Sequence, residues 1–511
     1  MPSNIHERVT LIVKNTLMLY IRMIIVAGVG LFTSRIVLEQ LGVIDYGIYN
    51  VVGGVITLFS FLNGAMAQST QRFLSFELEQ NNPRKVREIF KASLTVHIAI
   101  GLIILILAET VGVWFLNNKM VIPAGQMESA RRVFQCVVIS LFINILSISY
   151  NSAIIAREKM QIYAYISILD VCIKLGIAYS LSNFAGNKLQ FYAVLLLLSN
   201  VLVSAIYIVY CKRNFSECAG FGLSFNKENL RSLAGFISWT AFGSLAWVSR
   251  QQGYNVLLNL FFGPVVNAAY GISNQVNNVI GNFVRNYTTA LNPQIVKNYS
   301  AGEYVDMNRL VMYGSKIAFL LLFLISFPIL LCTSQVLHLW LVDVPEYAVI
   351  FTRLFIVNSL IESFTHSMGI SIIATGKIRV YQIVVGGILL LNIPLGYILL
   401  KSGTMPPILF VVMIFLTFTA MVIRLIIMRK LIPGFSIRKF VNTTFRPSII
   451  ISAIATIIFI AVNYYGVADG LNIFITLGLS FIIIFFLEYY IVLGHNEREQ
   501  LCNFFRRIIA K

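Results

Sequence analysis

The sequence predicts an all-α integral membrane protein with about fourteen transmembrane helices. Three observations predict this class: the composition, a series of apolar runs of membrane-spanning length, and an internal repeat. Of 511 residues, 58% are hydrophobic and only 12% are charged, and the mean hydropathy is +0.81. Soluble domains carry about 25% charged residues. A chain this apolar therefore crosses the bilayer repeatedly, and it does so as helices because helices satisfy their own backbone polar groups.

Each predicted helix is an apolar run long enough for the bilayer core, which is ~30 Å thick and needs about 20 helical residues. The runs at 46–68, 236–262 and 265–291 are the most polar, which depresses their hydropathy. The predicted spans are 14–38, 46–68, 92–116, 133–156, 162–185, 189–211, 236–262, 265–291, 310–333, 349–375, 378–400, 405–428, 447–465 and 471–493.

The basic residues predict the orientation of these helices. The net charge is +18, and most Lys and Arg fall in the two termini and in alternate loops. By the positive-inside rule both termini are cytoplasmic, which agrees with an even number of helices. The charge then reflects topology and attraction to anionic membrane lipids, so we expect no nucleic-acid partner. We identify no cleavable signal sequence, and the six cysteines lack CxxC spacing, so we expect neither a metal site nor a disulfide framework.

Two sequence patterns recur in the same order along the chain. Gly42-x6-Tyr49 reappears as Gly263-x6-Tyr270, an offset of 221 in the numbering, and IIAREKMQIY (154–163) reappears as IIATGKIRVY (372–381), an offset of 218. Six helices separate the copies, so the two lobes have the same membrane orientation, as in parallel-repeat transporters. The predicted organisation is a six-helix lobe at 1–211, a cytoplasmic linker at 212–235, a second six-helix lobe at 236–428, and two additional helices with a cytoplasmic tail at 429–511.

Polar side chains share one face of the predicted helix 265–291, at three-to-four residue spacing. Such a face cannot point into lipid, so it contacts either protein or water. One interpretation is hydrogen bonding between packed helices. The interpretation that we favour for the whole set is a hydrated cavity. The amides that we select as its lining are Gln251, Asn255, Asn274, Asn277 and Asn278.

Three arginines lie within predicted helices and are candidate ligands for an anion. Arg22 lies about 12 Å along its helix from Lys14, at 1.5 Å per residue, and Arg250 lies near the middle of its span. Ionisable residues at such depth mark substrate pathways by default. Arg285 lies nearer the cytoplasmic end, where it either joins the cavity or extends toward the lipid headgroups.

Two groups of residues are candidates for ion coupling. Asp170 and Lys174 are four residues apart on one helix, so they form either a neutralising pair or a coupling site. Glu362 and His366 share one face of another helix. A buried carboxyl group next to histidine suits proton or sodium coupling, and a structural pair is the alternative.

The sequence lacks the motifs that an enzyme of this kind would need. No GxxxxGK[ST] loop, DxD or HExxH motif is present, and the predicted external loops are short. We therefore expect a transporter, with no catalytic residues and no cofactor.

Several stretches resemble a known family of transporters. KNTLMLYIRMIIVAGVGLFTSRIVLEQLGVIDYGIYNVVGGV, NGAMAQSTQRFLSFELEQ and the repeated IIA-x2-K-x3-Y are similar to bacterial O-antigen and capsular polysaccharide flippases of the Wzx type. These belong to the multidrug/oligosaccharidyl-lipid/polysaccharide flippase superfamily. The resemblance implies a MATE-like fold in the bacterial cytoplasmic (inner) membrane. It also implies ion-coupled, alternating-access transfer of undecaprenyl-diphosphate-linked oligosaccharide repeat units from the inner to the outer leaflet, with other polysaccharide assembly proteins as partners.

The candidate residues suit such a substrate chemically. Amides and hydroxyls both donate to and accept from sugar hydroxyls, and arginines bind a diphosphate in a bidentate manner. The alternatives are a flippase for the peptidoglycan lipid precursor, a multidrug antiporter of the same superfamily, a polysaccharide polymerase or ligase, and a non-transporting scaffold. A drug antiporter is expected to use acidic residues for its cationic substrates, whereas the deep charges here are mainly basic.

Overall fold

The computed structural model consists of helices joined by turns and short loops, and contains no strand in the residues that it describes. It describes all of the chain except residues 1–4, 58–59, 119–121, 123–124, 220–221, 342–343, 465–472, 493, 495–497 and 499–511. The chain divides into two compact units. One unit is Val13–Ser244, and the other is Leu245–Lys511 together with the residues before Val13.

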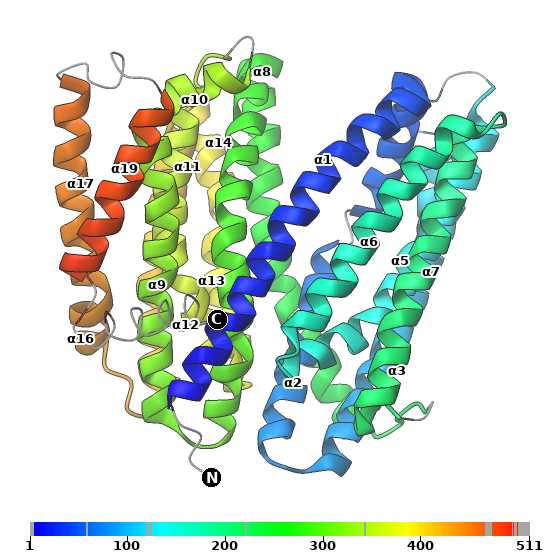
Figure 1. The fold of residues 1–511 in the computed structure, drawn as a ribbon, viewed down its shortest axis with the longest axis horizontal. Helices are drawn as coiled ribbons and strands as arrows, with labels where there is room; N and C mark the ends of the chain where they lie inside the picture. Colours follow the sequence, from blue (N-terminus) through cyan, green and yellow to red (C-terminus); the bar gives the residue numbers. More distant parts are fainter. Residues whose placement is uncertain are drawn as a thin grey trace, which may run out of the picture. The chain divides into compact units, whose positions relative to one another are not determined.

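The first unit contains most of α1 and the start of α8 (Figure 1). Its helices are α1 (Ile5–Thr57), α2 (Ser60–Glu79), α3 (Pro83–Leu107), α4 (Val113–Asn118), α5 (Met127–Ala156), α6 (Met160–Ser180), α7 (Lys188–Asn214) and the beginning of α8 (Lys227–Ser300). Helix α5 packs against α2, α3 and α7 at the centre of this unit.

The second unit continues along α8. Its further helices are α9 (Tyr304–Leu331), α10 (Thr333–Trp340), α11 (Ala348–Ser363), α12 (Thr365–Ala374), α13 (Arg379–Leu390), α14 (Asn392–Lys401), α15 (Ile408–Leu431), α16 (Ile437–Phe440), α17 (Arg446–Tyr464) and α19 (Ile473–Leu487). Helices α17 and α19, which follow the predicted twelve-helix core, both pack against α9 (Figure 1).

The all-α membrane class is confirmed, whereas the number fourteen is not. Within the described residues, eleven helical segments are long and apolar enough to cross a membrane. The described parts of the predicted span 46–68 belong to α1 and α2 and are not among them. Nor are the predicted spans 236–262 and 265–291, although α8 covers both as helix. Their amides, hydroxyls and arginines lower the hydropathy below that of a lipid-exposed span.

The repeated glycines share an unusual backbone conformation. Gly42 has φ 75° and ψ 169°, and Gly263 has φ 77° and ψ −170°; each kinks the long helix that contains it. This region of backbone space is essentially restricted to glycine. The sequence match between the two halves therefore corresponds to a repeated structural feature.

Two further pairs of turn residues follow the same register. Asn81 and Gly302 have φ values of 52° and 76°, and Glu158 and Gly376 have φ values of 60° and 78°. The first pair has the same offset as the two glycines, and the second pair has the offset of the IIA-x2-K-x3-Y match. Left-handed residues therefore end equivalent helices in both halves, which supports the predicted internal repeat.

We expect Gly263→Ala to lower the stability of the protein by about 1–3 kcal/mol, because alanine pays a steric cost at this φ and ψ. A Cβ at Gly263 would meet no neighbouring atom within 4 Å, so backbone strain is the only expected penalty. Gly271→Ala is the matched control: it lies in the same helix, has no positive φ and has equally open surroundings. Thermal unfolding in detergent should show a loss for the first variant and no loss for the second. Equal behaviour would contradict the prediction.

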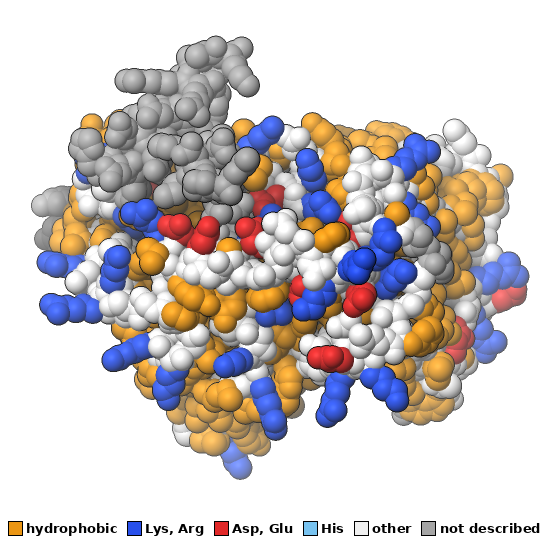
Figure 2. All heavy atoms as spheres, turned by 90° about the horizontal axis from the view of Figure 1, so that it is seen from below, with side chains coloured by type: hydrophobic (Ala, Val, Ile, Leu, Met, Phe, Trp, Pro, Cys, Tyr) orange, Lys and Arg blue, Asp and Glu red, His pale blue; other side chains and the backbone are white. Residues whose placement is uncertain are grey.

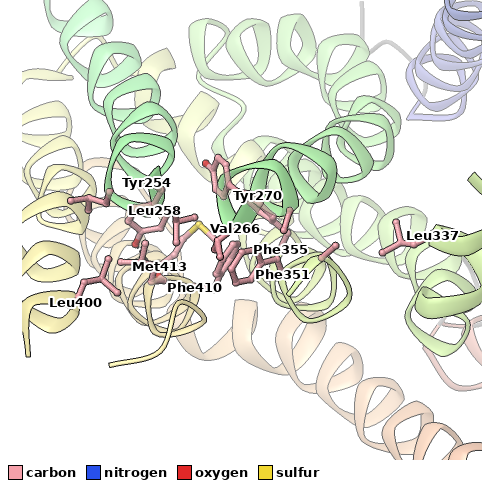
Figure 3. Packing of buried hydrophobic residues seen from close by; sticks show 14 residues of the cluster. Tyr254, Leu258, Val266, Tyr270, Leu337, Phe351, Phe355, Leu400, Phe410 and Met413 are labelled. Carbon is pink, nitrogen blue, oxygen red and sulfur yellow. Dashed lines mark hydrogen bonds between the residues drawn. The ribbon is translucent and has the colours of Figure 1, made fainter. Parts of the chain in front are cut away.

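An aromatic core fixes the two arms of α8 on either side of the Gly263 kink (Figure 3). Tyr254 lies before the kink and Tyr270 after it, and both are almost fully buried. The Tyr254 hydroxyl donates to Asn392 Oδ1 at 2.6 Å and to the Leu409 carbonyl at 2.8 Å. The rings of Phe351, Phe355 and Phe410 complete the cluster from α11 and α15. The polar segments of α8 are therefore held in place by a packed hydrophobic core.

Basic side chains lie near the helix–helix turns of each unit, and many Lys and Arg side chains are visible in the view of Figure 2. In the first unit, Arg84 and Lys85 begin α3 directly after the α2–α3 turn. In the second unit, Lys297 lies in the last turn of α8, before the α8–α9 turn. Both turns belong to the loops that the positive-inside rule assigns to the cytoplasm. The cytoplasmic location of the termini stays a prediction.

Candidate functional site

Arg250 lies on α8 in the second unit and is paired with an acidic residue. Its side chain is 7% exposed, and its Nη2 atom lies 3.6 Å from Glu362 Oε2. Its Nη1 atom donates to Thr417 Oγ1 of α15 at 3.5 Å. The structure thus brings together two residues that the sequence analysis assigned to different roles, Arg250 to anion binding and Glu362 to ion coupling.

Glu362 is the acidic member of a cluster of charged residues. Its carboxylate accepts a hydrogen bond from Asn358 Nδ2 at 3.5 Å, and the Trp247 side chain also influences it. It also interacts electrostatically with His366 and Arg424. Arg285 interacts with Glu362 and with His366. We call this set the charge cluster; its members are Arg250, Arg285, Glu362, His366 and Arg424.

The charge cluster carries more positive than negative charge, because its members include three arginines and one glutamate. Helices α8, α11, α12 and α15 supply its members. Arg250 is buried, whereas the Glu362 side chain is 28% exposed. A buried cation needs a nearby anion, since an unpaired buried charge is strongly unfavourable. An arrangement of this kind favours anionic ligands.

Arg285 is held along its own helix. Its Nε and Nη2 atoms donate to Asn282 Oδ1 at 3.2 and 2.5 Å, and Nη2 also donates to the Asn278 carbonyl at 3.3 Å. The side chain is exposed in the structure, so it remains accessible to a ligand or to lipid headgroups.

The predicted amide lining divides into two groups. Gln251 Nε2 donates to Asn274 Oδ1 at 2.7 Å, which joins the two arms of α8, and Asn277 Oδ1 accepts from Ser359 Oγ of α11 at 2.6 Å. These three amides therefore take part in the internal hydrogen bonds that were the alternative interpretation. The half-buried side chains of Asn255 and Asn278 make no hydrogen bond within the described part of the chain. They are the amides most available to a ligand.

The first unit has its own charged group. The Arg22 guanidinium lies 4.5 Å from the centre of the Tyr163 ring, and its buried Nε has no hydrogen-bond partner in the described structure. Lys174 Nζ donates to Asp170 Oδ2 at 2.8 Å, as the four-residue spacing predicted, while the buried Asp170 Oδ1 has no partner there. Arg22 and Asp170 both act electrostatically on Tyr207.

The sequence analysis did not select two residues that make polar interactions within the helices, Arg424 of the charge cluster and His97 of α3. Arg424, in the second half of α15, has the position of an arginine that extends toward headgroups. His97, which is fully buried in α3, hydrogen-bonds with Thr70 at 3.2 Å and with Ser149 at 2.9 Å. The sequence could have indicated His97, because an ionisable residue within a predicted membrane span is rare and is a candidate for function. Its counterpart in the second half, at the offset of the glycine repeat, is Ala318, so this polar network is not repeated.

Comparison with known proteins identifies the fold to which this architecture is similar. Residues 240–398 match the MatE family model. The structure superimposes on "MATE in the bent conformation" with a TM-score of 0.70 at 16% identity, covering 83% of this chain and 97% of that chain. The chain has the MATE fold. A match to an outward-facing "multidrug resistance MATE family transporter of the MOP superfamily" has a TM-score of 0.69 at 14% identity, over 82% of this chain and 95% of that one.

A third MATE-fold structure is a superfamily transporter from Pyrococcus furiosus. It has a TM-score of 0.65 at 13% identity and covers 82% of this chain and 95% of that chain. The "reverse polarity of binding pocket" in that protein is described as one that "suggests different function". No curated protein sequence matches the chain. The MatE match covers residues 240–398, and the likeness to these transporter structures shows that the chain shares their fold.

Proposed function

We propose that this MATE-fold protein is a flippase for undecaprenyl-diphosphate-linked oligosaccharide repeat units, which it moves from the inner to the outer leaflet of the bacterial inner membrane. The observation that carries the proposal is the charge cluster, in which Arg250 lies 3.6 Å from Glu362. Arg285 and Arg424 interact electrostatically with the same carboxylate. A diphosphate is a strong anion that guanidinium groups hold in a bidentate manner. The available amides Asn255 and Asn278 suit the hydroxyls of the attached sugar.

The second candidate is a multidrug antiporter, which the similarity to MATE multidrug structures favours. A cationic drug requires an accessible acidic residue in the transport site. In the second unit Glu362 is already paired with Arg250, and it interacts electrostatically with Arg285 and Arg424. The cluster would therefore repel a cation, and we favour the anionic substrate.

The other parts of the functional prediction are part of the same proposal. Arg22 is the proposed diphosphate ligand of the first unit, and Asp170–Lys174 and Glu362–His366 are the proposed sites of proton or sodium coupling. Both termini are proposed to be cytoplasmic, and other polysaccharide assembly proteins are proposed partners.

Transport in sealed proteoliposomes tests the substrate class. We expect the purified protein to move a fluorescent undecaprenyl-diphosphate oligosaccharide between leaflets, detected by loss of protection from a membrane-impermeant quencher. We expect no uptake of a cationic dye such as ethidium in the same vesicles. The third compound tested is the peptidoglycan lipid precursor. If the protein transfers this lipid alone, it is a flippase for that precursor. Uptake of ethidium without transfer of either lipid would overturn the proposal in favour of the antiporter.

A further inference from the structure

Glu362 occupies the position where an anionic ligand would meet Arg250. The Arg250 side chain is 7% exposed and its other polar contact is the neutral hydroxyl of Thr417, so the Glu362 carboxylate supplies its neutralising charge. Glu362 itself is 28% exposed and lies on the more accessible side of the pair. A ligand that approached Arg250 would therefore encounter the carboxylate.

The contacts of this pair are long compared with another ion pair of the same protein. Arg157 holds Glu217 through two contacts of 2.6 and 2.7 Å, whereas Arg250 approaches Glu362 at 3.6 Å and Thr417 at 3.5 Å. Charge-assisted hydrogen bonds of full strength are about 2.7–2.9 Å. The Arg250–Glu362 pair therefore leaves much of the binding capacity of the guanidinium unused.

We propose that Glu362 is an internal substitute for the phosphate of the substrate. It neutralises Arg250 while the site is empty, and an anionic phosphate ester displaces it on binding. The inference rests on the proposed function, because it names the residue with which the diphosphate competes. Trp247, Asn358, His366 and Arg424 also contact or attract the Glu362 carboxylate, so these groups stabilise it after displacement.

A membrane site that binds one anion after another must keep its buried arginine neutralised between substrates, and the exchange with Glu362 does this. Once the substrate leaves, a buried arginine without an anion is strongly unfavourable. Glu362 restores neutrality, so that the empty site can return for the next substrate. Two anions cannot share one guanidinium without repelling each other, so the same residue weakens substrate binding. Removing its charge should increase affinity and slow turnover.

Calorimetric titration of the full-length protein in detergent tests the proposal, with geranyl diphosphate as the probe. We expect E362Q to bind at least 10-fold more tightly than wild type. In proteoliposomes it should transfer lipid-linked oligosaccharide more slowly, a combination that simple damage to the site would not give. E109Q is the matched control: it removes a carboxylate from the helical turn after α3, in the other unit, where Gln135 Nε2 donates to Glu109 at 3.0 Å. Its affinity should equal that of wild type.

The outcomes separate this inference from the proposed function. If wild type binds the probe and E362Q binds no more tightly, Glu362 is not a competitor and the inference is overturned, while the flippase proposal stands. If neither protein binds, both are overturned. Should E362Q not be monodisperse, E362D takes its place, because the shorter side chain retracts the carboxylate. E362D should bind more tightly than wild type by a smaller factor, and equal affinity would overturn the inference.

Discussion

Arg250→Ala should reduce transfer of lipid-linked oligosaccharide in proteoliposomes at least 10-fold. The substitution removes the buried guanidinium that faces Glu362 and Thr417, and with it a bidentate partner for phosphate. It also leaves the Glu362 carboxylate without its nearest cation, which repels an anionic ligand. Leaflet-resolved transfer at matched reconstitution is the measurement. Arg22→Ala, which removes the arginine of the first unit, should reduce transfer as well.

A double variant distinguishes the two causes of that loss. Arg250→Ala combined with Glu362→Gln removes the unpaired carboxylate together with the arginine. If Arg250 holds the substrate, the double variant stays inactive; recovery of wild-type transfer would show that Arg250 serves only to neutralise Glu362. Arg353→Ala is the control for removing an arginine from the same unit, because Arg353 Nε donates to Thr333 Oγ1 at 3.3 Å away from the charge cluster. It should retain transfer.

Arg157→Ala should lower the stability of the protein by about 3–5 kcal/mol, the usual result of removing one partner of a buried ion pair. Arg157 follows α5, and its Nε and Nη2 atoms donate to the two carboxylate oxygens of Glu217, whose side chain is 3% exposed. Its guanidinium also lies 5.0 Å from the centre of the Phe215 ring. The hydrogen-bonded Glu217 carboxylate raises the pKa of Arg157. Without the arginine, a buried negative charge would remain unpaired.

Equilibrium unfolding in mixed detergent micelles measures this loss. The control is Arg132→Ala: Arg132 pairs with Glu128 four residues earlier, but the two side chains are 61% and 75% exposed. Exposed pairs of this kind contribute about 0–1 kcal/mol. The double variant Arg157→Gln with Glu217→Gln should recover much of the stability, because it leaves no buried charge. A loss no larger than that of Arg132→Ala would show that the Arg157–Glu217 pair is not structural.

Hydropathy does not detect the ordered structure within the linker predicted at 212–235. The short 3-10 turn at Ser216–Cys218 packs against α3, and Arg87 Nη2 donates to the Ser216 carbonyl at 2.9 Å. Helix α8 begins at Lys227, ahead of the predicted start at 236. The residues in between are polar, so an apolar window begins only after the helix has started. The predicted linker is thus an ordered part of the first unit wherever the structure describes it.

The membrane class, most helix positions and the repetition of glycine at 42 and 263 follow from the amino-acid sequence alone, and the structure adds that both glycines kink their helices. These are local properties: burial of an apolar run in lipid depends on the run alone, and a backbone conformation that excludes side chains demands glycine wherever it occurs. The spacing of Asp170 and Lys174 likewise predicted their contact, because residues four apart on a helix are neighbours.

The partners of the polar side chains depend instead on how the helices pack. Arg250 and Glu362 are far apart in sequence, and nothing in either helix indicates that α8 and α11 place them in one ion pair. The same applies to Asn277, whose bond to Ser359 separates it from the available Asn255 and Asn278. Helix periodicity states which residues share a face, whereas the packing of one helix on another determines what that face contacts.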